Sequence, residues 1–371
     1  MILIKTDRDT LLKPLQIVTG IVERRHTLPI LSNVLVQQDE KKLSFLATDL
    51  EIQIETSKEI SQPKEKNYAL TISAKKFQDI LRTLPADNNV TLNRQNDRLQ
   101  IKSGKSSFNL QILPPEDFPK ISEDSEPESI ITVPQKELKN LLHHVQFAIA
   151  QQDIRYYLNG LLLLIEEKSL KAVATDGHRL AYTAINLDKT YEKKEIILPR
   201  KTVLELEKLL AEDEEPITIE IFENKIRFIF SDIVLISKVI DGKFPDYKRV
   251  IPTDNTKIFN LDKSVFLQAL QRVSILSNIN EKFRGVRFVI NNGVLQVICK
   301  NSEQEEALEE VEIQYEDDPI DISFNITYLL DLLNNLACNT IQCAFKDANN
   351  SVLITYQENE DFKYIVMPMR I

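Results

Sequence analysis

The fold is decided by three stretches of the sequence: TISAKKFQDILRTLP at 71–85, ILPRKTVLELEKLL at 197–210 and ISFNITYLLDLLNNL at 322–336. Each stretch opens like a short strand and continues with apolar residues three and four positions apart, which is typical of an amphipathic helix. The leading isoleucines, Ile72, Ile197 and Ile322, are evenly spaced along the chain. One strand–helix unit is therefore predicted to occur three times.

Other markers return with nearly the same period. A second helical pattern places Leu11, Leu138 and Phe266 at matching positions, again at almost equal intervals. An ATD tripeptide at 47–49 returns at 174–176, and hairpin turns recur at matching places. Independent markers with one period favour an internal repeat over the alternative of unrelated α+β domains in series.

The strands carry the alternation that is typical of antiparallel sheets. In SFNLQIL at 107–113, Phe108, Leu110 and Ile112 share one face while polar residues occupy the other. This pattern belongs to sheets with one buried and one hydrated face. We expect an α+β fold of three repeated domains, each with two helices and antiparallel sheets. Acidic, proline-bearing connectors near residues 125 and 254 predict domains at 1–124, 125–253 and 254–371.

Composition sets the class of protein. The chain has 371 residues, 43% hydrophobic and 27% charged, which is ordinary for a soluble globular protein. It contains no apolar run of roughly 18 residues, as a membrane span needs, and its first ten residues are too charged for a signal peptide. The three cysteines, Cys299, Cys338 and Cys343, show no metal-site spacing. We therefore expect a cytoplasmic protein with unpaired thiols.

The net charge of −10 argues, taken alone, against a nucleic-acid partner, because DNA-binding surfaces are usually basic. The charges are unevenly distributed, however. Predicted helices carry cations such as Lys75, Lys76 and Arg82, whereas the segment 302–318 carries nine acidic residues. A basic face and an acidic face could coexist, since charges act over about 8 Å at physiological salt. Charge alone favours the simpler interpretation that these helix faces are solvated.

Patterns that would indicate an enzyme are weak. Asp176 and His178 could form an acid–base pair, but no sequence motif supplies the nucleophile and the orienting group that such a pair needs. The GKS at 104–106 imitates the end of a phosphate-binding loop, yet Leu99 stands where its first glycine would be. No HExxH or Cys/His zinc spacing occurs. We expect no catalysis, no cofactor and no metal; a hydrolase that uses Asp176 and His178 is the enzymatic alternative.

Seven motifs carry a resemblance to a known family. They are, in chain order, RRHTLPILSNVL at 24–35, ATDLEI at 47–52, QQDIRYYLNG at 151–160, TDGHRLA at 175–181, DGKFPDYKRVIP at 241–252, EKFRGVR at 281–287 and YIVMPMRI at 364–371. In this order and spacing they closely resemble the β subunits of bacterial DNA polymerase III, the sliding clamps. The resemblance runs from the first strand to the last residue.

The resemblance implies both a fold and a function. Each chain would contain three clamp domains, and two chains would join head to tail into a homodimeric ring. The ring would encircle duplex DNA without sequence preference and tether replicative and repair polymerases, conferring processivity. Implied protein partners are the DNA polymerase III alpha subunit, the clamp loader, translesion and repair polymerases, ligase and mismatch-repair proteins, all through short linear peptides. A repeat scaffold that binds proteins but not DNA is the alternative.

The C-terminal MPMRI is apolar, although chain ends are usually polar, and methionine suits a surface that accepts several partners. The resemblance implies that this end forms a hydrophobic peptide-binding cleft. The implied cleft residues are Leu158, Thr175, Gly177, His178, Arg179, Leu180, Pro245, Arg249, Val250, Asn325, Tyr328, Ser351, Ile365, Met367, Pro368, Met369, Arg370 and Ile371. Without the resemblance, Leu158, Leu180 and Val250 would be assigned to the core. Asn349 departs from the family pattern, which often has a small apolar residue there.

DNA contacts are also implied by the resemblance. The residues near the DNA path would be Arg25, Gln152, Arg155, Tyr156 and Tyr157. A basic residue beside paired tyrosines can bind phosphate and stack on an exposed base. The simpler interpretation is a surface arginine beside half-buried tyrosines.

The resemblance also implies which residues join two chains. Phe108 and Leu110 would form an exposed apolar strand edge in a monomer, which favours aggregation unless another strand covers it. The resemblance places Ile275 and Leu276 opposite them. The segment 277–285, just after this place, is longer than in some family members.

Overall fold

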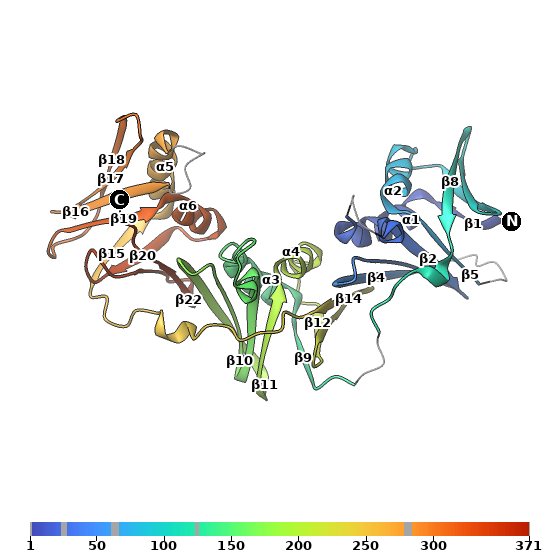
Figure 1. Ribbon diagram of the computed structural model, residues 1–371, viewed down its shortest axis with the longest axis horizontal. Helices are drawn as coiled ribbons and strands as arrows, with labels where there is room; N and C mark the ends of the chain where they lie inside the picture. Colours follow the sequence, from blue (N-terminus) through green and yellow to red (C-terminus); the bar gives the residue numbers. More distant parts are fainter. Residues whose placement is uncertain (1, 24–27, 61–66, 123–125, 278–283, 371) are drawn as a thin grey trace. The chain divides into compact units, whose positions relative to one another are not determined.

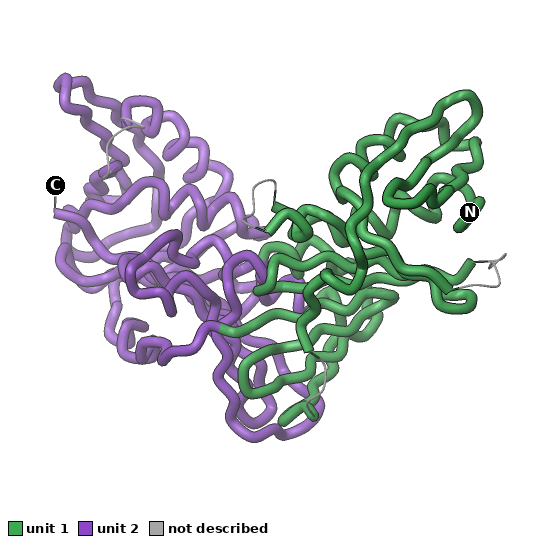
Figure 2. The backbone as a smooth tube through the Cα atoms, turned by 45° about the vertical axis from the view of Figure 1, so that its right-hand side comes forward, with its two compact units in different colours: residues 1–136, 204–239 green, residues 137–203, 240–371 purple. Residues whose placement is uncertain are grey.

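The computed structural model describes residues 2–23, 28–60, 67–122, 126–277 and 284–370 (Figure 1). The backbone groups into two compact units (Figure 2). Unit 1 comprises Met1–Lys136 and Leu204–Val239, and unit 2 comprises Glu137–Val203 and Ile240–Ile371. None of the helices in this described part of the chain is long and apolar enough to cross a membrane.

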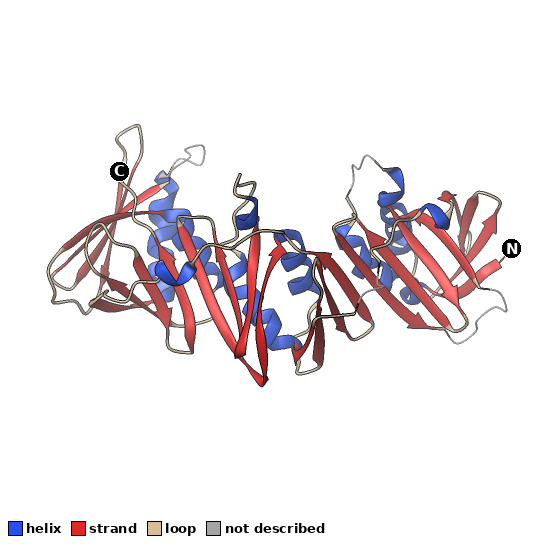
Figure 3. Ribbon diagram, turned by 60° about the horizontal axis from the view of Figure 1, so that its bottom comes forward, coloured by secondary structure: helices blue, strands red, loops and turns tan. Residues whose placement is uncertain are grey.

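The described residues form six α-helices, two in each predicted repeat (Figure 3). They are α1 (Arg8–Val18), α2 (Ala74–Thr83), α3 (Gln135–Gln146), α4 (Arg200–Leu209), α5 (Lys263–Val273) and α6 (Ile326–Asn335). Short 3-10 turns are η1 (Thr19–Ile21), η2 (Pro29–Ser32), η3 (Pro115–Asp117), η4 (Tyr156–Asn159), η5 (Tyr247–Arg249) and η6 (Ser274–Leu276). Helices α2, α4 and α6 each follow directly on a strand, so the strand–helix unit predicted from the sequence is confirmed.

Polar side chains fix where several of these helices begin. The carboxylates of Asp7 and Asp262 accept backbone hydrogen bonds in the first turns of α1 and α5. The side chain of Asn325 does the same at the start of α6. Such caps satisfy backbone N–H groups that have no partner within the helix.

Unit 1 contains one antiparallel sheet of 12 strands, in the order β1-β6-β7-β8-β5-β2-β3-β4-β14-β13-β12-β9. The strands are β1 (Ile2–Asp7), β2 (Asn33–Asp39), β3 (Lys42–Thr48), β4 (Ile52–Glu59), β5 (Tyr68–Ser73), β6 (Asn89–Gln95), β7 (Arg98–Ser103), β8 (Ser106–Leu113), β9 (Ser129–Pro134), β12 (Pro216–Ile221), β13 (Lys225–Phe230) and β14 (Ile233–Lys238). Helix α1 packs on β3, β4 and α2, and α2 packs on β2 and β5. Leu11, Phe45 and Phe77 are fully buried in this core.

Unit 2 contains two sheets. The larger has six strands in the order β10-β11-β22-β21-β20-β15, and the smaller has four in the order β18-β17-β16-β19. The strands are β10 (Gly160–Thr175), β11 (Arg179–Pro199), β15 (Lys257–Asp262), β16 (Gly285–Asn291), β17 (Val294–Lys300), β18 (Glu306–Glu312), β19 (Ile320–Asn325), β20 (Thr340–Phe345), β21 (Val352–Tyr356) and β22 (Asn359–Val366). Helix α5 packs on β17, β18 and α6. The rings of Phe266, Phe288 and Phe324 follow one another at 5.8 and 5.5 Å between centroids.

Successive repeats are joined by strand pairing. In unit 1, β4 of the first repeat pairs antiparallel with β14 of the second, so that Leu235 lies beside Ile54. In unit 2, β11 of the second repeat pairs with β22 of the third, and Ala181 lies beside Tyr364. All four side chains are fully buried. Because backbone hydrogen bonds cross both joints, strands of the middle repeat belong to both units.

A half-buried histidine, His144, lies at the joint in unit 2. Nδ1 of His144 lies 2.6 Å from the carbonyl oxygen of Asn140, and Nε2 lies 2.8 Å from the hydroxyl of Tyr356. A carbonyl can only accept a hydrogen bond, so Nδ1 carries the proton and Nε2 accepts from Tyr356. The ring also packs on Phe362, with 5.7 Å between centroids. Burial, and to a lesser degree the neighbouring His143, lowers the pKa of His144.

We predict that His144 makes the fold less stable in acid. A histidine whose pKa is lower when folded takes up its proton mainly in the unfolded chain, so stability is lost as the pH falls below about 6.5. Replacement by phenylalanine (His144→Phe) should reduce the fall in unfolding free energy between pH 7.5 and pH 5.5, measured by urea denaturation. His178→Gln, at an exposed histidine, is the control. An unchanged fall in His144→Phe would contradict the prediction.

Candidate functional site

A cavity of about 800 Å³ opens in unit 2 where four segments meet: the loop after α3, the turn between β10 and β11, the start of α6 and the C-terminal segment. Its lining residues are Ile149, Ala150, Gln151, Asp153, Arg155, Asp176, His178, Arg179, Asn325, Tyr328, Met367, Pro368, Met369 and Arg370. We call this cavity the cleft. Its walls come from the second and the third repeat. These segments are far apart in the sequence and meet only in the folded chain.

The turn between β10 and β11 is held by its own side chains. The hydroxyl of Thr175 donates to the carbonyl of Arg179 at 2.6 Å and accepts from the N–H of Gly177 at 3.0 Å. One carboxylate oxygen of Asp176 accepts from the N–H groups of His178 and Arg179, at 2.9 and 3.1 Å. Gly177 sits at a φ of +91°, in the left-handed region. The TDGHR sequence thus encodes a rigid wall of the cleft.

Arg179 joins this turn to the third repeat. Its guanidinium donates to Asp176 at 3.1 Å, to Asp331 at 2.7 Å and to the carbonyl of Phe147 at 2.7 Å. It also lies 4.5 Å from the ring centroid of Tyr328. Burial disfavours its charge, yet neighbouring acidic groups, including Tyr364 and Asp331, raise the pKa of Arg179 above its ordinary value. Burial raises the pKa of Tyr328 to about 12.

The C-terminal segment is fixed by backbone hydrogen bonds while its side chains stay accessible. The N–H of Met367 donates to the carbonyl of His178 at 2.9 Å, and that of Met369 donates to the carbonyl of Ser323 at 2.7 Å. The side chain of Met367 is nevertheless 40% exposed. An apolar group held in place and left open to solvent is suited to binding a partner. Ile371 lies outside the described residues.

The structure brings together about half of the residues implied for the cleft. Those that line it are His178, Arg179, Asn325, Tyr328, Met367, Pro368, Met369 and Arg370. Leu180 and Ile365 are buried next to it in a cluster with Phe244 and Tyr247, through which the segment with Pro245, Arg249 and Val250 packs on the sheet. Leu158 and Thr175 are also buried, and Val250 is 36% exposed.

Ser351 and Asn349 do not line the cleft, whereas several residues that were not predicted from the sequence do. Ser351 precedes β21, and its carbonyl accepts from Asn255. Asn349 is exposed, and its N–H donates to Asp347. Ile149, Ala150, Gln151, Asp153 and Asp176 line the cleft without having been singled out from the sequence as cleft residues. Ile149 and Ala150 are apolar residues in the loop after α3, and an apolar pair of this kind is predicted to be core, so it carried no signal of a cleft.

The implied DNA-contacting residues lie in the loop 151–159. Gln152 and Tyr156 are exposed, and the ring of Tyr156 meets that of Tyr157 edge-on at 5.8 Å. The guanidinium of Arg155 donates to both carboxylate oxygens of Asp153, at 3.0 and 2.8 Å, and to the carbonyl of Asp176 at 3.1 Å. The side-chain and backbone hydrogen bonds that Asp153 accepts from Arg155 lower the pKa of Asp153 to about 2. Arg25 lies outside the described residues.

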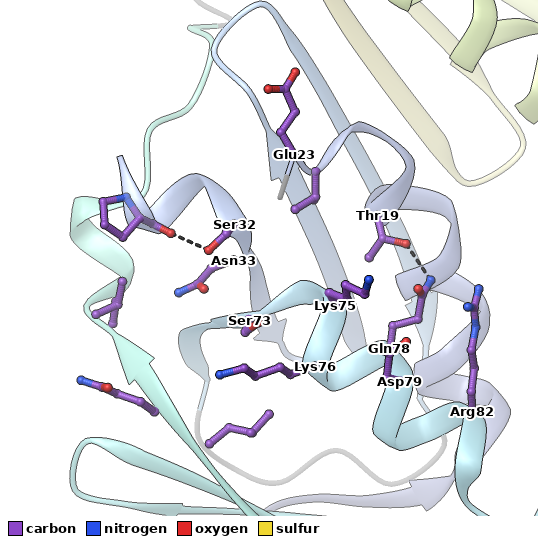
Figure 4. A pocket seen from close by; sticks show the side chains of 15 residues that line it. Thr19, Glu23, Ser32, Asn33, Ser73, Lys75, Lys76, Gln78, Asp79 and Arg82 are labelled. Carbon is purple, nitrogen blue, oxygen red and sulfur yellow. Dashed lines mark hydrogen bonds between the residues drawn. The ribbon is translucent and has the colours of Figure 1, made fainter. Parts of the chain in front are cut away.

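The residues implied for the joint between chains lie at two places. Phe108 and Leu110 are half-buried on β8 in unit 1. Leu110 lines a hollow of about 1020 Å³, whose wall carries Lys75, Lys76 and Arg82 from α2 (Figure 4). In unit 2, Ile275 and Leu276 lie in η6, directly after α5. Ile275 is 79% exposed.

Asp176 and His178 are arranged as parts of a turn. Both oxygens of the Asp176 carboxylate accept hydrogen bonds, from backbone N–H groups and from Arg179. A carboxylate used in this way orients the backbone of the turn. Within the described ranges, no group of three His, Cys, Asp or Glu side chains is placed to hold a metal ion.

We predict that Arg179 is essential for the stability of this wall. Its removal in Arg179→Met should lower the unfolding free energy by about 3 kcal/mol, because Asp176 and Asp331 lose a largely buried cation. Arg249→Met is the matched control: Arg249 is 85% exposed and pairs with Asp246 at 2.9 Å, so a change below about 0.5 kcal/mol is expected. Equal losses in both variants, measured by urea denaturation, would count against this role of Arg179.

Three family models match the chain in order. They describe the DNA polymerase III beta subunit: its N-terminal domain matches residues 2–122, its central domain 132–246 and its C-terminal domain 248–370. The beta sliding clamp of Vibrio cholerae is 42% identical over 365 residues, covering 98% of this chain and 99% of that protein. The beta sliding clamp of Escherichia coli is 40% identical over 365 residues, with the same coverage.

Solved structures agree with this similarity. The crystal structure of the sliding clamp from Pseudomonas aeruginosa bound to griselimycin superposes with a TM-score of 0.94 at 39% identity, covering 100% of both chains. The sliding clamp from Caulobacter crescentus superposes with a TM-score of 0.91 at 38% identity, covering 99% of both chains.

Proposed function

The chain belongs to the DNA polymerase III beta subunit family, the bacterial sliding clamps, and from this premise we propose that it acts as a homodimeric ring that encircles duplex DNA and tethers polymerases. It is a DNA sliding clamp and a processivity factor, not a catalytic enzyme. The family implies binding to DNA and polymerases and self-association as a dimer. The observation that carries the ring proposal is the strand joint, which occurs twice within the chain.

Each joint pairs two strands, one from a β-hairpin of each repeat. The equivalent strands β8 and β18 each have room for a further partner strand. Strand β8 is the equivalent of β14. Phe108 of β8 pairs with Ile101, and at the matching place of the next repeat Leu235 of β14 pairs with Phe228. In the joint of unit 1, Leu235 is covered by β4. By contrast, β8 meets its neighbour β5 only at Thr71 and Ile72, and these pair with the far end of β8.

The complementary strand is β18. Ala307 of β18 pairs with Cys299 as Ile54 of β4 pairs with Ala47. Strand β18 is the last strand of its sheet, so one edge carries no strand among the described residues. Repeating the joint between two chains would place β8 of one chain along β18 of the other, with Phe108 next to Ala307. Two copies of this heterologous joint close a ring.

Charge and exposure support this pairing. The hollow beside β8 carries Lys75, Lys76 and Arg82 (Figure 4). Strand β18 carries acidic side chains at four of its seven positions, which complements these cations. The exposed Ile275 follows α5, the helix that packs on β18. We therefore assign Phe108, Leu110, Ile275 and Leu276 to the dimer interface.

A charge placed in this joint should separate the two chains. Phe108→Glu would bring a carboxylate into an apolar, acidic interface, at a cost of several kcal/mol. We expect the wild type to sediment as a dimer at micromolar concentration and Phe108→Glu to sediment as a monomer. Ile130→Glu, at an apolar residue of β9 that is 50% exposed, is the control and should remain a dimer. A dimeric Phe108→Glu would refute this interface.

The cleft is the proposed binding site for partner peptides. Its accessible Met367 and its rigid polar wall suit a short apolar peptide whose backbone needs hydrogen-bond partners. We assign all the residues implied by the resemblance to this site. Its proposed ligands are peptides of the DNA polymerase III alpha subunit, the clamp loader, translesion and repair polymerases, ligase and mismatch-repair proteins. Griselimycin, which is bound by the relative from Pseudomonas aeruginosa, is a proposed ligand as well.

Loss of an accessible methionine side chain should weaken the cleft. Truncation in Met367→Ala removes apolar surface that a ligand would cover, at about 1.5 kcal/mol or roughly tenfold in Kd. We expect this loss for griselimycin in isothermal titration calorimetry. Ile130→Ala, at an exposed apolar residue of unit 1, should bind like the wild type. Equal affinity of Met367→Ala and wild type would speak against this site.

The DNA path is proposed to run along the loop 151–159. Gln152, Arg155, Tyr156 and Tyr157 would contact it, together with Arg25 from the first repeat. Contact with phosphates alone is independent of sequence and sensitive to salt, which lets a closed ring slide.

The three domains are proposed at 1–124, 125–253 and 254–371, and the proposed site of action is the cytoplasm. No cofactor is required.

A further inference from the structure

A residue with a positive φ occurs in the hairpin turn β3–β4, β10–β11 and β17–β18 of each repeat: Leu50, Gly177 and Gln304, with φ of +79°, +91° and +65°. The first two positions are equivalent, because Ala47 pairs with Ile54 as Ala174 pairs with Ala181. The third turn is one residue longer, since Cys299 pairs with Ala307. Only the second of these turns forms a wall of the cleft.

The side-chain scaffold of the turn is the same in the first two repeats. The hydroxyl of Thr48 donates to the carbonyl of Ile52 at 2.9 Å and accepts from the N–H of Leu50 at 3.0 Å. Thr175 makes the matching pair of hydrogen bonds around Gly177. Since leucine occupies the equivalent place in the first repeat, the backbone conformation alone does not account for the glycine at 177.

An arginine also approaches this position closely. A Cβ atom on Gly177 would lie 2.9 Å from Nη2 and 3.0 Å from Nη1 of Arg155. A side chain at 177 would therefore shift the guanidinium from its present place. The spacing that relates Gly177 to Leu50 relates Arg155 to Leu28, so the first repeat has no arginine at this place.

Asp153 holds Arg155 in place. Asp153 accepts three hydrogen bonds from Arg155, two from the guanidinium and one from the backbone N–H at 2.8 Å. The side-chain amide of Asn159 bonds both the N–H and the carbonyl of Asp153, each at 2.9 Å, and so closes the loop. The guanidinium then reaches out to the carbonyl of Asp176 at 3.1 Å. Loop and turn are thus braced against each other.

We propose that Arg155 is a positioning residue for the cleft. Its guanidinium is held by Asp153 and donates a hydrogen bond to the carbonyl of Asp176, which fixes the turn in its binding conformation. From that turn, Asp176 orients Arg179, and the carbonyl of His178 holds the N–H of Met367. Arg155 therefore acts on ligand affinity through the cleft wall. This role rests on the proposed function of the cleft as a ligand-binding site.

The test is a double-mutant cycle with griselimycin as the probe and no DNA present. Arg155→Ala removes the brace, whereas Gly177→Ala displaces the guanidinium and also strains the turn, which has a φ of +91° at this residue. We expect Arg155→Ala to weaken binding about tenfold, the value of one charge-assisted hydrogen bond, and Gly177→Ala to weaken it at least as much. The double variant should lose less than the product of the two single losses, because both changes break the same contact. Leu50→Ala, in the equivalent turn of the first repeat, is the matched control and should bind like the wild type.

Two further variants separate bracing from direct ligand contact. Asp153→Asn weakens the support of Arg155 and should lower the affinity; an arginine that simply touched the ligand would be freed and bind as well or better. Arg155→Lys should not restore binding, since a single ammonium cannot bridge Asp153 and the carbonyl of Asp176. Unfolding midpoints within a few degrees of wild type will show that the losses arise in the cleft.

The inference is overturned if Arg155→Ala or Gly177→Ala binds griselimycin like the wild type, or if the loss in the double variant equals the product of the two single losses, as independent effects would give. Absence of binding by the wild type would instead refute the proposed ligand site, and the role of Arg155 with it. The wild-type titration thus distinguishes the two failures.

Discussion

Antiparallel strand pairing between successive repeats is the constraint on which the rest of the structure depends. Each joint buries paired side chains, as Leu235 and Ile54 are buried in unit 1 and Ala181 and Tyr364 in unit 2. A one-residue slip would turn every side chain to the opposite face, so burial fixes the register. The same pairing brings β22 beside β11 and thereby delivers the C-terminal methionines to the turn that contains His178.

The cleft illustrates how a repeated element acquires a function. The first two repeats share a turn, to which the second repeat adds Gly177 and Arg155 and the third repeat adds the C-terminal segment. Acidic side chains in the cleft are engaged in hydrogen bonds: Asp153 is bonded by Arg155, and Asp176 by Arg179. The wall is thus rigid and locally neutral, while the side chains of Met367 and its neighbours remain available. A rigid wall lowers the entropic cost of binding a flexible peptide.

The sequence predicted the local features well, because strand alternation and helical spacing are properties of neighbouring residues. The three strand–helix units and their antiparallel sheets are confirmed. The surroundings of Arg155 could not be predicted, because Asp176, whose carbonyl accepts from its guanidinium, lies on a different segment of the chain. Ile149 and Ala150 have the apolar pattern of a core, and only the folded chain makes them part of the cleft.

The central claim, a closed ring held on DNA by its topology, is tested most directly by retention on circular and linear DNA. The protein would be loaded with a compatible clamp loader and ATP onto nicked circular plasmid, and loading would be verified. Half of the sample would be linearised, and both halves would pass through a sizing column in high salt, which weakens phosphate contacts. Our account predicts that protein stays on the circles and is lost from the linear DNA. Equal loss from both would contradict it.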